Sequence, residues 1–204
     1  MIMHYLSHLS KDKRLKKIIA VQEPVKLQRK KNIHIHLCGS IMSQQLSTRV
    51  ADVIHKRFLK LYDGVPSPQQ ILGTGFDQLR GIGLSNAKTA YVQNVARFAI
   101  DQGMEYQQLN KMGDEEVIAY LTQIKGVGRW TAEMMLMFAL GREDVFAIND
   151  LGIQQAMIKM YKLDRTNKKQ FREDMLKISK QWSPYRTYAC IHLWRWKDVP
   201  PVTE

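Results

Sequence analysis

Apolar residues recur at the spacing of a helix along most of this chain. Residues 43–62 hold one such stripe, formed by Leu46, Val50, Val53, Ile54, Phe58 and Leu61. A stripe of period 3.6 is typical of an amphipathic helix that packs on a core. Comparable stripes predict helices over residues 85–101, 114–124, 130–140, 151–161 and 168–182. The 130–140 segment is apolar on nearly every face and should be buried centrally. Only helical periods persist over long windows, so we predict an all-α fold.

Residues that cap helices mark several of these boundaries. Ser85 precedes the stripe that ends near Asp101, and a hydroxyl at that position can accept a hydrogen bond from the first turn. Asp114-Glu115-Glu116 places three carboxylates at the positive end of the next helix. Ser183-Pro184 predicts the N-cap and first residue of a last helix that runs to about Lys197.

The N-terminal part is strongly basic. Residues 11–31 are rich in Lys and Arg, and Leu15, Ile18 and Ile19 within them predict a short helix. Such a run is usually a solvated face, and it can also lie against a nucleic-acid backbone. We expect the basic segment of about residues 1–31 to pack with the C-terminal helices.

The next segment is ambiguous in secondary structure. Residues 33–37 alternate apolar and polar like a strand, but five residues do not separate a strand from a helix. His34 and His36 lie there. We predict structural or exposed roles for both histidines, because no further metal ligands follow at useful spacing.

The charge balance suggests a polyanionic partner. The 204 residues suffice for one domain or two small interlocked lobes, and we predict a single domain over residues 1–204. Lys and Arg number 31 against 19 Asp and Glu, a net charge of +12. Such a surface suits nucleic acid, because each Lys or Arg placed on a phosphate releases a condensed counterion. A generally basic surface is the alternative.

Cysteine content and hydropathy indicate the compartment. Cys38 and Cys190 lie far apart and form no cluster, so we expect a reducing cytosol or nucleus and no disulfide framework. The longest apolar run, residues 134–140, is far too short to span a bilayer, and we expect no secretory signal.

The most informative stretch is a glycine hairpin between two predicted helices. Gly126-Val127-Gly128 allows positive φ and a close approach of the backbone to a ligand. The first N–H groups of the following helix can hold an anion, and Lys125 and Arg129 add positive charge. A plain helix–helix turn is the alternative. Leu79-Arg80-Gly81-Ile82-Gly83 has the same shape, and spacing alone does not separate the two sites.

Other candidate residues also have two interpretations. Asp150 is a candidate catalytic carboxylate, and it also suits the N-cap of the helix that starts at Leu151. Trp130 and Trp194 offer aromatic faces, or they belong to the core. Gln45 is a candidate wedge into DNA with Leu46 beside it, or it decorates a helix surface.

Taken together, these motifs resemble the helix-hairpin-helix DNA glycosylase superfamily, and within it the 3-methyladenine DNA glycosylase II branch. The resemblance covers about residues 30–197. It rests on an ordered set of segments: Ser43-Gln44-Gln45-Leu46-Ser47, Gly83-Leu84-Ser85 with Lys88, Gly126 to Ala132, Asp144-Val145-Phe146 leading to Asp150, and Trp182-Ser183-Pro184-Tyr185-Arg186 running into Trp194. The loop before Asp150 lacks the proline of the family's signature.

The resemblance implies a two-lobed helical fold with the active-site cleft between the lobes. It implies that Asp150 is catalytic and that the base pocket contains Trp130, Met134 and Trp194. The implied DNA contacts are the hairpin N–H groups of Gly126, Gly128 and Thr131, with Gln45 filling the gap left by the flipped nucleotide. A monovalent cation, Na⁺ or K⁺, would bind the main-chain carbonyls of Thr122, Ile124 and Val127.

Position 130 bears on the mechanism. Bifunctional members of the superfamily carry a lysine after the hairpin that attacks the sugar, and this chain has Trp130 there. We therefore predict a monofunctional enzyme that flips out alkylated purines, such as 3-methyladenine and 7-methylguanine, and hydrolyses the glycosidic bond. No iron–sulfur cluster or other required cofactor is expected.

Two alternatives stay open. One is a glycosylase for oxidised or mismatched bases, and the other is a non-catalytic helix-hairpin-helix module that only binds DNA. In each case the expected partner is double-stranded DNA, with no membrane association. We expect a monomer that is cytoplasmic, in the bacterial nucleoid, or nuclear in a eukaryote.

Overall fold

The computed structural model describes residues 2–197, apart from the side chains of residues 2, 3 and 48. Over these residues the secondary structure consists of helices and contains no strand, which confirms the all-α prediction. None of the described helices is long and apolar enough to cross a membrane. The chain forms two compact units, one from Met1–Leu27 and Gly141–Glu204 (unit 1) and one from Gln28–Leu140 (unit 2).

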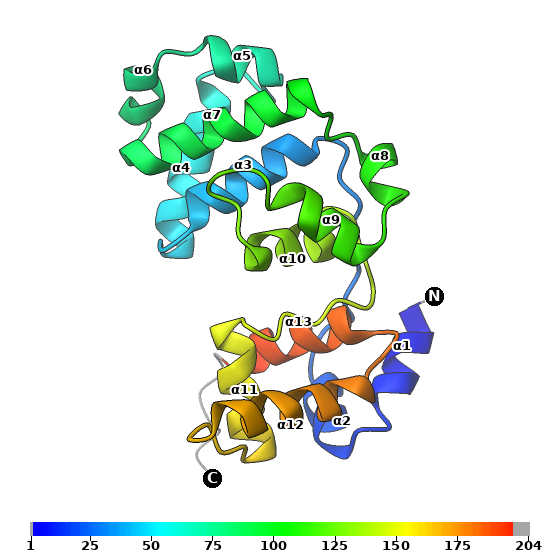
Figure 1. The fold of residues 1–204 in the computed structure, drawn as a ribbon. Coiled ribbons are helices and arrows are strands. Elements are labelled where there is room, and N and C mark those ends of the chain that lie inside the picture. The colour runs from blue at the N-terminus through cyan, green and yellow to red at the C-terminus, as the bar shows by residue number, and fades with distance from the viewer. Residues whose placement is uncertain (1, 198–204) are drawn as a thin grey trace. The chain divides into compact units, whose positions relative to one another are not determined.

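Unit 2 is built around a helix that other helices cover (Figure 1). Its helices are α3 (Ile33–Ser43), α4 (Thr48–Lys60), α5 (Pro68–Gly73), α6 (Phe76–Gly81), α7 (Asn86–Asp101), α8 (Tyr106–Asn110), α9 (Asp114–Leu121) and α10 (Arg129–Phe138). Helix α3 packs against α4, α7 and α10, and α5 lies along α7.

The strand-like alternation at residues 33–37 belongs to α3. Its buried side chains lie on several faces: Ile33, Ile35, Leu37, Cys38, Ile41 and Met42. A helix with neighbours on several sides buries more than one stripe, so its apolar pattern loses the 3.6 period. Within this segment the His34 Nε2 lies 3.0 Å from the Pro66 carbonyl oxygen, a structural contact.

Unit 1 joins the two ends of the chain. Its helices are α1 (Ile2–Leu9), α2 (Lys13–Ile19), α11 (Leu151–Tyr161), α12 (Lys168–Lys180) and α13 (Arg186–Lys197). Helix α13 packs against α11 and α2, and the ring of Tyr5 on α1 stacks on Tyr188 at 4.1 Å. The basic N-terminal helices therefore pack with the C-terminal ones.

The carboxylate of Asp12 links helices α2 and α11 to the turn that follows α12. Its Oδ1 caps α2 by accepting hydrogen bonds from the backbone N–H groups of Arg14 and Leu15. Its Oδ2 accepts from the Tyr161 hydroxyl at 2.6 Å and from Trp182 Nε1 at 3.2 Å. Burial raises the pKa of Asp12, but the hydrogen bonds outweigh it, so the pKa lies below its ordinary value.

Several predicted helix boundaries are confirmed. Ser85 caps α7 by accepting from the backbone N–H of Lys88 at 3.3 Å, and α7 ends at Asp101 as expected. Helix α9 begins at Asp114, and α11 spans Leu151–Tyr161.

Other details of the prediction were wrong. The last helix begins at Arg186, because the Ser183 hydroxyl donates to Asp144 instead of capping the helix at position 183. Helices α1 and α8 were not predicted. The middle of α10 is buried, but Trp130 and Phe138 near its ends are 40% and 46% exposed.

One buried titratable group in unit 1 links stability to pH. His192 on α13 is fully buried, with its Nδ1 2.8 Å from Gln22 Oε1. Burial lowers its pKa from 6.5 to about 4, with a further lowering by the charge of Arg195. The folded protein therefore holds a neutral imidazole where the unfolded chain would bind a proton.

We predict that unfolding free energy falls as the pH drops from about 6.5 towards 4. The unfolded state takes up a proton that folded His192 resists, which corresponds to a loss of up to about 3 kcal/mol. Urea unfolding at a series of pH values checks this. His192→Gln should flatten the dependence, whereas the exposed-site control His4→Gln should keep it. An unchanged slope in His192→Gln would contradict the prediction.

Candidate functional site

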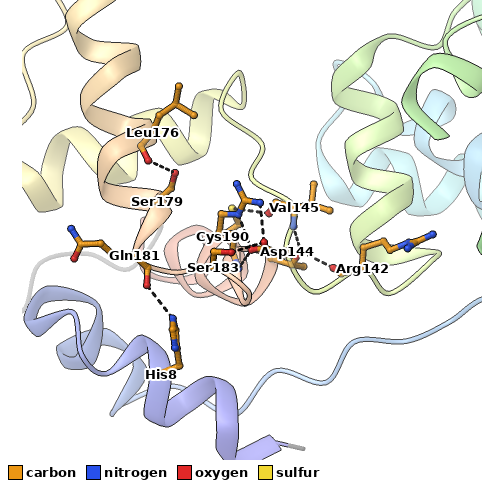
Figure 2. Close-up of polar contacts among 11 residues, drawn as sticks. His8, Arg142, Asp144, Val145, Leu176, Ser179, Gln181, Ser183 and Cys190 are labelled. Carbon is orange, nitrogen blue, oxygen red and sulfur yellow. Dashed lines mark hydrogen bonds and ion pairs between the residues drawn. The ribbon is translucent and has the colours of Figure 1, made fainter. Parts of the chain in front are cut away.

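Hydrogen bonds and an ion pair join the segment that leads to Asp150 to the start of α13 and the turn before it (Figure 2). The Asp144 carboxylate accepts from the Ser183 hydroxyl at 2.7 Å and from Arg186 Nε and Nη2 at 2.7 and 2.9 Å. The Val145 N–H donates to Thr187 Oγ1 at 3.0 Å, and the Thr187 N–H donates to the Glu143 carbonyl at 3.0 Å.

These contacts keep Asp144 ionised. Burial raises the pKa of its carboxyl, but the hydrogen bonds from Arg186 and Ser183 lower the pKa by more than burial raises it. The pKa of Asp144 therefore lies below its ordinary value. A bidentate arginine also fixes the orientation of the carboxylate. Asp144 therefore acts as a structural anchor, and it sets the path of the chain towards Asp150.

Asp150 is both a helix cap and a partner of a tryptophan. Its Oδ1 accepts from the backbone N–H of Ile153 and from Trp194 Nε1, each at 2.8 Å. Only 9% of the residue is exposed. The two interpretations of Asp150 are thus compatible, because the bonds that cap α11 also orient the carboxylate.

Gly152 makes this arrangement possible, and the sequence analysis did not single it out. A Cβ built at Gly152 would lie 3.1 Å from Asp150 Oδ1 and 3.1 Å from Trp194 Cδ1. That is tighter than most side-chain contacts, so a larger residue would push Trp194 and the carboxylate apart. A glycine two residues after a candidate catalytic Asp was the available signal.

In unit 2 the hairpin between α9 and α10 requires its first glycine. Gly126 has a φ of +105°, and a Cβ there would lie 2.3 Å from the ring of Tyr91 on α7. Gly128 is the N-cap of α10, with nothing within 4 Å of a Cβ built on it and no side chain to cap the helix. The start of α10 therefore combines open space with helix N–H groups.

The similar stretch at Gly81–Gly83 differs in this respect. Gly83 also has a positive φ, of +109°, but the helix that follows is capped by the Ser85 hydroxyl. A capped N-terminus has less to offer an anion than one whose N-cap is glycine. The structure thus separates two hairpins that the sequence left equivalent.

Charged side chains around the hairpin differ in their partners. Arg129 binds Glu115 with Nη1 and Nη2 at 2.9 and 2.5 Å, and Glu133 with Nε at 3.0 Å. Two carboxylates therefore offset its charge. Lys125 is exposed, and its carbonyl accepts from Asn94 Nδ2 at 3.2 Å.

The three carbonyls expected to hold a cation lie in the same hairpin. The Ile124 carbonyl accepts from the Val127 N–H at 2.9 Å and keeps a second lone pair. Thr122 and Val127 flank it in sequence. A cation site there stays a prediction.

The loop with the wedge candidate has an unusual backbone. Gln45 is exposed with a φ of +58°, a conformation that costs a residue with a Cβ about 1–3 kcal/mol and persists only when neighbours enforce it. Leu46 beside it is 37% exposed. Both side chains stand between the end of α3 and the start of α4.

Lys88 is the neighbour that holds this loop. Its Nζ donates to the carbonyls of Met42 and Gln44 at 2.9 and 2.6 Å, and burial lowers its pKa. The adjacent Gln44 reaches the hairpin, with Nε2 3.5 Å from the Gly126 carbonyl and 3.4 Å from Thr131 Oγ1. The wedge loop and the hairpin are therefore joined within unit 2.

The predicted pocket residues of unit 2 share helix α10. Trp130 is at its exposed start, and Met134 lines a cavity of about 390 Å³ together with His36, Ser43 and His55, among others. The third pocket residue, Trp194, contacts Asp150 in unit 1. Among the described residues, no group of three or more His, Cys, Asp or Glu is placed to hold a metal ion.

The chain is similar to proteins that repair DNA. Residues 38–181 match the family model of the HhH-GPD superfamily base excision DNA repair proteins. DNA-3-methyladenine glycosylase 1 of Schizosaccharomyces pombe is 32% identical over 98% of this chain and 88% of its own length.

Solved structures are similar over nearly the whole chain. The S. pombe 3-methyladenine DNA glycosylase in complex with abasic DNA has a TM-score of 0.84 at 31% identity, covering 98% of this chain and 99% of that one. A DNA-3-methyladenine glycosidase of Bacillus halodurans has a TM-score of 0.80 at 33% identity, covering 94% and 88%.

The two hairpin glycines should respond differently to alanine. We predict that Gly126→Ala lowers the unfolding free energy by about 2–4 kcal/mol, from positive φ and the clash with Tyr91. Gly128→Ala, where the Cβ meets open space, should lower it by about 1 kcal/mol or less, since alanine is a poorer N-cap than glycine. Urea denaturation followed by circular dichroism measures both, and equal losses would refute the distinction.

Proposed function

The chain belongs to the HhH-GPD superfamily of base excision DNA repair proteins, and we propose that it is a monofunctional DNA N-glycosylase for alkylated purines. Its substrates are duplex DNA with 3-methyladenine or 7-methylguanine, and its products are the free base and an abasic site. The relatives named as 3-methyladenine glycosylases support this substrate class.

The observation that carries the proposal is the carboxylate of Asp150. It is buried and oriented through one oxygen by the N–H groups of Ile153 and Trp194. A carboxylate held in this way can stabilise positive charge without reorganising during the reaction, and such preorganised electrostatics is usually the largest catalytic contribution.

The proposed chemistry needs little acid catalysis. Purines alkylated at N3 or N7 are cationic and leave the sugar readily, so an oxocarbenium-like sugar forms as the glycosidic bond breaks. Asp150 stabilises this cation and accepts a proton from the water that attacks the sugar. Trp130 and Trp194 offer aromatic faces to the cationic base, an interaction of about 0.5–2 kcal/mol.

The base reaches the site only after it leaves the duplex. Extruding a nucleotide costs a few kcal/mol, and least when the pair is damaged. We propose that Gln45, with Leu46 beside it, fills the gap that the base leaves. The N–H groups of Gly126, Gly128 and Thr131 bind a backbone phosphate, Met134 contributes to the base pocket, and Lys125 adds charge, with a smaller part for the paired Arg129.

Further features belong to the same proposal. Thr122, Ile124 and Val127 bind Na⁺ or K⁺ through their carbonyls, and no other cofactor is required. The protein acts as a monomer in the bacterial nucleoid or, in a eukaryote, in the nucleus.

Asp150→Asn tests the central role. Asn keeps an Oδ1 that can accept from both Ile153 and Trp194, so the fold should survive while the negative charge is lost. We expect the single-turnover rate of 7-methylguanine release to fall about 10²-fold or more, in line with the loss of one preorganised electrostatic group.

Asp144→Asn is the matched control in the same segment. It weakens the pairing with Arg186 but keeps an Oδ1 acceptor, so it should lower the melting temperature and, well below that temperature, reduce base release by much less than Asp150→Asn does. Near-full excision by Asp150→Asn would overturn the assignment of Asp150. If the wild-type protein releases no alkylated base, the proposed function fails as a whole.

The monofunctional mechanism has its own test. Borohydride added during turnover should trap no covalent protein–DNA adduct, because Trp130 offers no amine to attack the sugar. Denaturing gel electrophoresis with end-labelled duplex detects such an adduct. A strong band at the adduct's mobility would show that an amine of the enzyme attacks the sugar and would contradict the monofunctional mechanism.

Lys88→Met tests whether the hydrogen bonds from Lys88 to the loop of Gln45 contribute to base flipping. It removes the ammonium that binds the carbonyls of Met42 and Gln44. We expect excision from a fully paired duplex to fall about tenfold, or about 1.4 kcal/mol, relative to the same lesion opposite an abasic site, where flipping costs less.

The control is Lys111→Met, at an exposed lysine of unit 2. It should leave the ratio of the two rates unchanged. Equal losses on both substrates in Lys88→Met would indicate a merely structural role.

A further inference from the structure

Unit 1 contains a cavity that none of the roles above uses. It has a volume of about 300 Å³ and lies between the segment before Asp150 and the start of α12. Its lining consists of Ile148, Asn149, Gln154, Arg165, Lys168, Phe171, Arg172 and Met175.

The lining carries three cations and no carboxylate. Within residues 2–197, Arg165 and Lys168 form no ion pair, and the one hydrogen bond of the Arg172 side chain goes from Nη1 to Asn149 Oδ1 at 3.2 Å. Two acidic neighbours in sequence have other partners: Asp164 accepts from Thr166, and Asp174 accepts from Gln170. Glu173, next to Arg172, is exposed and does not line the cavity. Three like charges around one hollow repel one another, and an anion between them would relieve that repulsion.

The helix and the apolar residues around the cavity also favour an anionic ligand. Helix α12 is 13 residues long and begins beside the cavity at Lys168, so its positive dipole end lies there, although the Asn167 side chain already accepts from the Gln170 N–H at 3.1 Å. The side-chain charges therefore carry more of the preference for an anion than the helix end does. Ile148, Phe171 and Met175 are buried and form an apolar surface next to the charges. An anionic group attached to a less polar body, such as the phosphate of a nucleotide, fits this combination.

We propose that this cavity binds a phosphodiester of the DNA strand that contains the target base. The inference rests on the proposed glycosylase function. Asn149 lines the cavity and directly precedes Asp150, so the cavity adjoins the backbone that leads into the proposed catalytic residue. The hairpin belongs to unit 2, and a phosphate bound here anchors the strand on the unit that carries the catalytic group.

The salt dependence of DNA binding tests the proposal. The double substitution Arg165→Gln with Lys168→Gln removes two charges and leaves the Arg172–Asn149 bond in place. The slope of log K against log salt concentration should become shallower by about 1–2, since each lost phosphate contact contributes about 0.9. Fluorescence anisotropy with an abasic-analogue duplex measures this slope.

The control lies on the same helix. Lys177→Gln with Lys180→Gln removes two exposed charges from the far end of α12, away from the cavity lining. Its slope should stay within about 0.5 of the wild-type value. Equal slopes in the cavity and control variants would overturn the proposal.

Free nucleotides distinguish the source of the phosphate. Deoxynucleoside monophosphate and inorganic phosphate are titrated into the wild-type protein and the cavity variant by calorimetry. If the cavity variant loses binding of the monophosphate but keeps the wild-type slope on DNA, the cavity holds a free nucleotide and the proposal is wrong. Base release by the wild type is measured separately, so a failure of the glycosylase function is distinguishable from a failure of the phosphate site.

Discussion

One carboxylate oxygen connects the fold of unit 1 to its chemistry. Oδ1 of Asp150 accepts from the third N–H of α11 and from the indole N–H of Trp194. The first bond ties the carboxylate to the start of a helix, and the second ties it to α13. Gly152 leaves room for both. These bonds orient the carboxylate before any substrate binds, which is what electrostatic catalysis requires.

The residues before Asp150 are also fixed by hydrogen bonds to α13. Asp144 and Arg186 form a bidentate pair, and Thr187 accepts from the Val145 N–H, so α13 fixes the loop at several points. Charge-assisted hydrogen bonds of this geometry are among the stronger polar interactions in proteins. Helix α13 thus supports the carboxylate both directly, through Trp194, and through the segment that delivers it.

In unit 2 the proposed DNA contacts depend on polar side chains that touch backbone. Lys88 binds the carbonyls at the end of α3, and Gln44 reaches the hairpin at Gly126 and Thr131. The wedge candidate and the proposed phosphate clamp are therefore connected by hydrogen bonds within unit 2. A glycosylase that flips a base gains from this, since the strand must be held while the gap is filled.

The sequence by itself determined what depends on neighbours along the chain. The cap at Ser85, the start of α9 at Asp114, the helix from Leu151 to Tyr161 and the all-α class follow from local periods and from residues typical of helix starts. Tertiary structure decided what depends on distant residues. Ser183 donates to Asp144 and so does not cap α13, and α3 is covered on several sides and so loses its stripe. The two glycine hairpins became distinct only when Tyr91 was seen against Gly126 and Ser85 was seen to cap the helix after Gly83. The basic cavity likewise brings Asn149, in the segment before α11, to Arg172 on α12, and no local pattern encodes a contact between residues so far apart in sequence.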